Sequence, residues 1–102
     1  MKKTRSMIIH ETAESRELFL YSVNNGVLYA RAIVPTIRNL AKKYRAGKFD
    51  AERAIDAFYH VSTMASDMYN RDFGYRFSVT ERYTAAAAMK DYFMEDIETE
   101  VA

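Results

Sequence analysis

The sequence contains no cysteine, which excludes disulfide bonds, thiol nucleophiles and thiolate metal sites. Its three glycines, Gly26, Gly47 and Gly74, stand alone, so the chain has no glycine-rich loop to hold a phosphate group. The lack of cysteine suits a reducing compartment.

The motifs of common enzymes and of membrane proteins are missing as well. The segment HETAE at residues 10–14 has the outline of a zinc-binding HExxH helix, but a glutamate stands where the second histidine is needed. His60 is the only other histidine, and no serine lies in a GxSxG turn. No stretch approaches the roughly 20 apolar residues of a membrane helix. We predict no metal, no cofactor, no enzymatic activity and no membrane segment.

The single proline, Pro35, lies inside a segment with a helical pattern. Ile33, Ile37, Leu40 and Tyr44 are spaced so that they share one side of a helix. Proline lacks the amide hydrogen that a helix interior needs, at a cost of about 3 kcal/mol. Either one helix over residues 27–46 is kinked, or a first helix ends at Val34 and a second begins with Pro35. Because no polar cap or glycine separates residues 27 and 35, we predict one kinked helix.

Capping residues and turn residues mark the ends of three more helices. Thr12 is a typical N-cap for a helix that ends at Asn24, where the following Asn25-Gly26 predicts a turn closed by glycine. Asp50 caps a helix that ends between residues 70 and 74. Ser78 and Glu81 form a capping box for a helix over residues 79–98, in which four successive alanines raise the helix propensity.

Apolar stripes on these helices predict the core. The clearest stripe is on the third helix and a second is on the fourth: Ala54, Phe58, Val61, Ala65 and Met68, and Ala86, Met89, Phe93 and Ile97. Helices joined by short turns favour antiparallel packing. We predict an all-α fold, a small four-helix bundle with a Pro-kinked second helix. It forms a single helical domain over residues 1–102, of which residues 1–10 are a basic, flexible tail.

Charge is distributed unevenly along the chain. Residues 1–48 hold ten lysines and arginines against three glutamates, a net charge of +7, whereas residues 49–102 carry a net charge of −6. The simplest interpretation is that the two halves pack together and neutralise each other. Alternatively, one charged face is a docking site, or copies of the chain associate through opposite charges.

Two sets of charged residues are the candidate partner-binding faces. The basic face of helix 27–46 and the turn after it comprises Arg31, Arg38, Lys42, Lys43, Arg45 and Lys48. The acidic face of the last helix comprises Asp91, Glu95 and Glu98. Basic side chains interleaved with tyrosines also fit nucleic acid, but the acidic second half of the chain argues against a dedicated nucleic-acid binder.

Several segments together resemble a family of short bacteriophage-encoded proteins that has no established activity. They are IIHETAESRELFLYSVNNGVLY, RNLAKKYRAGKFD with the following AERAIDAFYH, and MYNRDFG, which cover roughly residues 8–74. The resemblance implies a phage product in the cytoplasm of the bacterial host, and it assigns no site residues. We therefore predict a small interaction protein that binds, and in the sharper form of the hypothesis inhibits, a host protein or defence complex. The alternative is an accessory protein that binds nucleic acid through the basic face.

Overall fold

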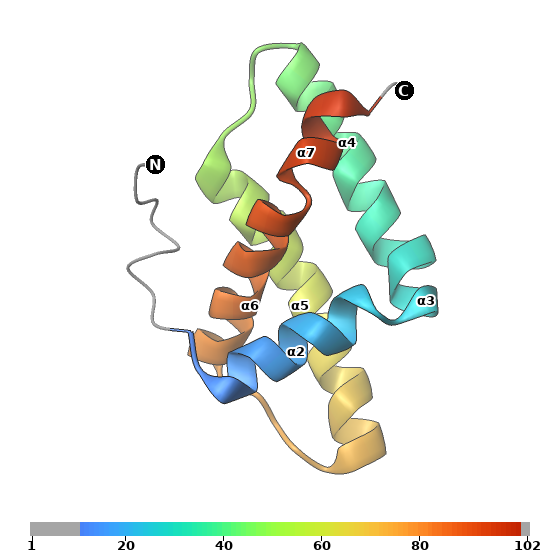
Figure 1. Cartoon of the computed structure of the whole chain (residues 1–102), viewed down its shortest axis with the longest axis vertical. Helices are drawn as coiled ribbons and strands as arrows, with labels where there is room; N and C mark the ends of the chain where they lie inside the picture. Colours follow the sequence, from blue (N-terminus) through green and yellow to red (C-terminus); the bar gives the residue numbers. More distant parts are fainter. Residues whose placement is uncertain (1–10, 101–102) are drawn as a thin grey trace.

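The computed structural model describes residues 11–100, and within this range the chain forms helices and no strands. Figure 1 shows α5 and α6 side by side, with α2 packed across both of them and α4 packed against α7. The elements are α2 (Ala13–Val23), α3 (Gly26–Leu28), the π-helix η1 (Tyr29–Ile33), α4 (Val34–Arg45), α5 (Ala51–Phe73), α6 (Val79–Tyr92) and α7 (Met94–Thr99). The predicted all-α class is confirmed.

The predicted helix starts are confirmed by their caps. The Thr12 hydroxyl accepts a hydrogen bond from the Ser15 amide at 3.1 Å, and the Asp50 carboxylate accepts one from the Arg53 amide at 2.9 Å. The Ser78–Glu81 pair forms the expected capping box. Each cap gives a partner to a backbone amide that has none inside its own helix. These starts therefore follow from local chemistry alone.

The predicted core stripes are buried, with two exceptions. Phe58, Met89 and Ile97 are fully buried at the centre of the cluster. Met68 is half-buried and packs against the core from its edge. Tyr44 was predicted to be a core residue, and this was wrong, because its side chain is 41% exposed and packs on Phe49 near the end of α4. The core therefore ends at Leu40 and Ala41 on this helix.

A π-helix turn precedes Pro35. The chain stays in the right-handed helical region at Leu28, Ile33 and Val34, and the Val34 amide donates to the Tyr29 carbonyl five residues earlier. Such a turn is one way in which a helix accommodates a proline, and the Thr36 hydroxyl donates to the Ala32 carbonyl at 2.8 Å. The helical path is thus continuous from α3 to α4, while the kink itself stays a prediction.

Two of the three glycines end helices. Gly47 follows α4 with φ +72° and Gly74 ends α5 with φ +75°, a region that favours glycine. The predicted role of Gly26 was wrong. Asn24 ends α2, and the Asn25 side chain accepts from the Leu28 amide at 2.9 Å, so that Gly26 is the first residue of α3.

The single helix predicted over residues 79–98 is divided at Phe93. Phe93 has φ −97° and ψ 8°, outside the regular helix, and its ring is buried and stacked on Phe58 with centroids 5.9 Å apart. The break allows α7 to pack against α4. The division thus coincides with a buried aromatic contact, at a point where local propensity alone would continue the helix.

Three alanines of α6 contribute to close packing as well as to helix propensity. Ala85, Ala86 and Ala87 are at most 1% exposed, and α6 packs against both α2 and α5. Small side chains permit neighbouring helices to approach closely.

The predicted basic tail at residues 1–10 lies outside the described residues. Within residues 11–100, no helix is both long and apolar enough to cross a membrane.

Candidate functional site

The predicted basic face lies on α4, on the preceding η1 and on the turn that follows α4. All of its members are exposed: Arg31, Arg38, Lys42, Lys43, Arg45 and Lys48. Their surroundings differ from one residue to the next. Two of them contact the C-terminal end of the described chain, and two others line a cavity.

Arg38 and Arg45 contact Glu100, which follows α7. The Arg38 Nε lies 3.6 Å from a Glu100 carboxylate oxygen, and an Arg45 guanidinium nitrogen donates to the Glu100 backbone carbonyl at 2.8 Å. The Arg38 side chain is 65% exposed, so its ion pair contributes at most about 1 kcal/mol. The basic and acidic halves of the chain therefore meet here, as the simpler interpretation of the charge distribution predicts.

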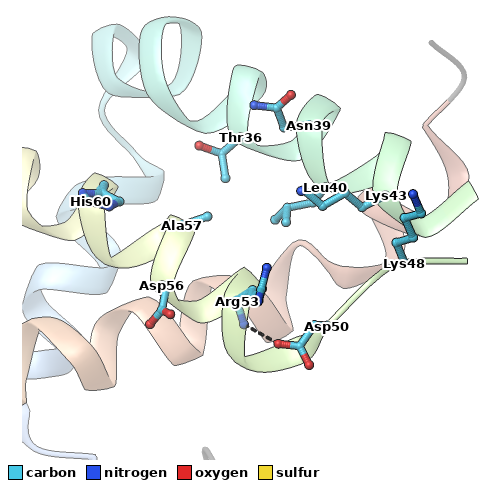
Figure 2. Close-up of a pocket in the computed structure, with 10 residues that line it drawn as sticks. All are labelled: Thr36, Asn39, Leu40, Lys43, Lys48, Asp50, Arg53, Asp56, Ala57 and His60. Carbon is cyan, nitrogen blue, oxygen red and sulfur yellow. Dashed lines mark hydrogen bonds between the residues drawn. The ribbon is translucent and has the colours of Figure 1, made fainter. Parts of the chain in front are cut away.

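Lys43 and Lys48 line a cavity between α4 and the first half of α5, with a volume of about 420 Å³. Figure 2 shows His60 at one end of this α4–α5 cavity and Lys48 at the other. Its remaining lining residues are Thr36, Asn39, Leu40, Asp50, Arg53, Asp56 and Ala57. Eight of the ten lining residues have polar or charged side chains, and both cations and carboxylates are among them.

Arg53 and His60 were not predicted as site residues. Arg53, Asp56 and His60 are spaced by three and four residues, so they share one side of α5 next to the buried stripe. That periodicity is visible in the sequence, but only the fold brings this side of α5 opposite Lys43. Arg53 is exposed and lines the cavity, while its backbone amide donates to the Asp50 carboxylate.

The predicted acidic face is not a continuous surface of one helix. Asp91 lies on α6 and binds Lys90, whose Nζ is 2.6 Å from the carboxylate and whose side chain is buried. Glu95 and Glu98 lie beyond the break, on α7, and are exposed. The prediction that these three residues share a helical side was wrong because the helix turns at Phe93.

A cluster of tyrosines joins α2 to α5. Tyr21 and Tyr69 pack edge to face with ring centroids 5.2 Å apart, and the Tyr69 hydroxyl donates to Glu17 at 3.3 Å. Burial raises the pKa of Tyr69, and the Glu17 carboxylate raises this pKa further. The folded chain therefore favours the neutral phenol of Tyr69.

This raised pKa predicts a loss of stability at high pH that Tyr69→Phe reduces. Tyr69 ionises more readily in the unfolded chain, near pH 10, so its stabilising contribution is intact below that pH and is lost as the pH rises through the folded-state pKa. Between about pH 9 and pH 11, the urea midpoint should fall less steeply for Tyr69→Phe than for the unaltered chain. Groups other than Tyr69 titrate in both proteins, so their effect on the urea midpoint cancels in the comparison. An equal fall of the urea midpoint with pH in both proteins would contradict this account.

Metal-binding groups and relatives give no further assignment. No three His, Asp or Glu side chains lie close enough to hold a metal ion in the part of the chain that the structure describes. His10 of the HETAE segment lies outside that part. Comparison of the chain with models of protein families, with curated proteins and with solved structures gives no match.

Proposed function

We propose that this chain is a small helical interaction protein that binds an acidic segment of a host protein at the α4–α5 cavity, with no chemistry of its own. The observation that carries the proposal is the grouping of Lys43, Lys48 and Arg53 around that cavity. Within residues 11–100 none of these three side chains forms an ion pair, whereas Arg38 contacts Glu100. Cations on a hollowed surface attract carboxylates of a partner.

A protein partner is favoured over nucleic acid by the carboxylates among these cations. Asp50 and Asp56 line the same cavity, and they would repel a phosphate backbone. An acidic segment that also carries some cationic side chains can match such a lining, whereas every unit of a nucleic-acid backbone is anionic. The exposed Tyr44, which packs on Phe49 beside Lys48, adds an aromatic contact of the kind that is common in protein interfaces.

The resemblance to phage proteins supplies the proposed setting. A phage product of this kind would act in the cytoplasm of the bacterial host, where its partner would be a host protein or a defence complex. Inhibition of that partner by occlusion requires no catalytic residue.

Association between copies of the chain through opposite charges is the competing proposal. Light scattering at low and high salt measures the molecular mass in solution and so detects such association directly.

Charge reversal at two lysines tests the proposal. We expect Lys43→Glu with Lys48→Glu to weaken capture of an acidic partner from host lysate by about tenfold or more, because both side chains are exposed and line the cavity. Far-UV circular dichroism should show unchanged helicity. Arg71→Glu with Arg76→Glu makes the same change in net charge at exposed positions elsewhere and should leave capture intact.

Two outcomes would overturn the proposal. Equal capture by both double variants would remove the α4–α5 cavity from the binding surface. A mobility shift with DNA or RNA that is lost only in the lysine variant would replace the protein partner with nucleic acid. Reversal of Arg38 or Arg45 is a less direct test, because both side chains also contact Glu100.

A further inference from the structure

A second hollow lies at the other end of α5, between that end, the first turns of α2 and the connection to α6. Its volume is about 480 Å³. Figure 1 shows these three segments together at the lower end of the molecule, where the connection runs from α5 to the start of α6. The aromatic groove, as we name it, is lined by Ala13, Glu14, Glu17, Tyr69, Phe73, Tyr75 and Phe77.

The four rings of the aromatic groove hold one another in place. Tyr69 packs on Phe73 with centroids 4.6 Å apart and on Phe77 at 5.0 Å, and Tyr75 packs edge to face on Phe77 at 4.7 Å. Phe77 is buried and anchors the group in the core. Each ring of the groove therefore contacts at least one other ring of the group.

Two of these rings face solvent. Phe73 is 65% exposed and Tyr75 is 40% exposed. Apolar surface that stays in water does not contribute the stability that its burial would give. Exposed aromatic groups next to a hollow are typical of binding surfaces. The folded chain thus presents aromatic surface that its own core does not cover.

The acidic side of the groove is formed by α2. Glu14 and Glu17 lie one turn apart on this helix, and Glu17 accepts the Tyr69 hydroxyl at 3.3 Å. Tyr75 donates in turn to Glu81, also at 3.3 Å. Neither Glu14 nor Glu17 forms an ion pair with any residue in the range 11–100. The groove therefore combines aromatic rings with two carboxylates, and none of the residues 11–100 that line it is a cation.

We propose that the aromatic groove binds an arginine side chain of a partner protein. A guanidinium group is planar, so it stacks on exposed rings such as Phe73 and Tyr75 while its N–H groups donate to the carboxylate of Glu14 or Glu17. A phosphate or an acidic segment is excluded by the same carboxylates. The groove differs in charge and in position from the α4–α5 cavity, so this proposal does not depend on the proposed function.

Short blocked peptides test the groove on the full-length chain. We expect Ac-Gly-Arg-Gly-NH2 to shift the aromatic NMR signals of Phe73 and Tyr75 with an affinity on the order of 1 mM, as befits one side chain in an open groove. The same peptide with citrulline, which replaces the guanidinium by a neutral urea of similar shape, should bind at least about tenfold more weakly.

Substitutions in the groove should reproduce this loss. Glu17→Gln keeps the shape of the side chain and should weaken the arginine peptide about tenfold. Phe73→Ala removes an exposed ring and should weaken it about threefold or more. Glu95→Gln removes the same charge from the exposed surface of α7 and should change nothing.

Three results would overturn the proposal. Equal binding of the arginine and citrulline peptides would show that charge is not recognised. A lysine peptide that binds as tightly as the arginine peptide would remove the guanidinium from the account. A gain in peptide affinity when Lys2, Lys3 and Arg5 are replaced by glutamine would identify the chain's own basic segment as the occupant, in place of a partner.

Discussion

Replacement of Phe58 by alanine is expected to lower the free energy of unfolding by about 3 to 5 kcal/mol. Phe58 is fully buried on α5, and its ring stacks on Phe93 with an angle of 16° between the planes. Removal of the ring leaves a cavity between elements that hold their own positions, so the surrounding side chains can collapse only in part. The loss includes the contact that seats Phe93 at the break between α6 and α7.

Urea unfolding followed by circular dichroism measures this effect. A chain of this size has a total stability of about 5 to 15 kcal/mol, so Phe58→Ala removes a large share of it and Phe58→Leu provides a milder second point. Phe73→Ala is the matched control, because the same ring is removed from a position that is 65% exposed. Its cost should stay within about 1 kcal/mol. Equal costs at residues 58 and 73 would contradict the assigned core.

Helix starts and buried stripes were predictable because each depends on residues within one or two turns. Thr12, Asp50 and Ser78 cap their helices as predicted, since a side-chain oxygen next to an unpaired amide is a local arrangement. The spacing of Ala54, Phe58 and Val61 likewise fixes one side of α5 whatever its neighbours are. Local chemistry therefore predicts most of the helical framework.

The interruptions of the helices were not predictable in the same way. The division at Phe93 accompanies a ring contact with Phe58, which lies far away in the sequence, so no local pattern indicates it. The π-helix before Pro35 is one of several ways to accommodate a proline, and the residues around it do not select among them. Tyr44 fits the helical stripe but lies past the end of the core, a boundary that only the packing of the other helices sets.

The candidate sites show the same division between local and distant information. Lys43 and Lys48 could be named from their clustering, yet their cavity also needs Arg53 and His60 from α5. The contacts of Arg38 and Arg45 with Glu100 join residues more than fifty positions apart, which no local pattern reports. For the aromatic groove, the helical spacing of Tyr69 and Phe73 was visible, but the approach of Phe77, Glu14 and Glu17 was not.

Replacement of Ile97 by alanine is expected to detach α7 without unfolding the rest of the chain. This helix has six residues and no side-chain cap, so it cannot persist alone and depends on its packing against α4. Ile97 is fully buried and is its main apolar anchor, and its truncation should cost about 2 to 4 kcal/mol. Of the remaining contacts, Met94 is only partly buried against the core, and those of Arg38 and Arg45 with Glu100 are too exposed to compensate.

Amide hydrogen exchange separates this local opening from global unfolding. The backbone amides of residues 97 and 100 donate to the Phe93 and Asp96 carbonyls. In Ile97→Ala these two amides should exchange about 30-fold to several hundredfold faster. If α7 opens independently, amides in the middle of α5 should keep their exchange rates. Glu98→Ala, at an exposed position of the same helix, should leave both sets unchanged. Equal acceleration in α5 and α7 would instead show that α7 belongs to the cooperative core. When α7 opens, the Arg38 and Arg45 side chains no longer contact Glu100. Comparing how strongly Ile97→Ala and the unaltered chain bind an acidic partner therefore shows whether α7 limits access to these two arginines.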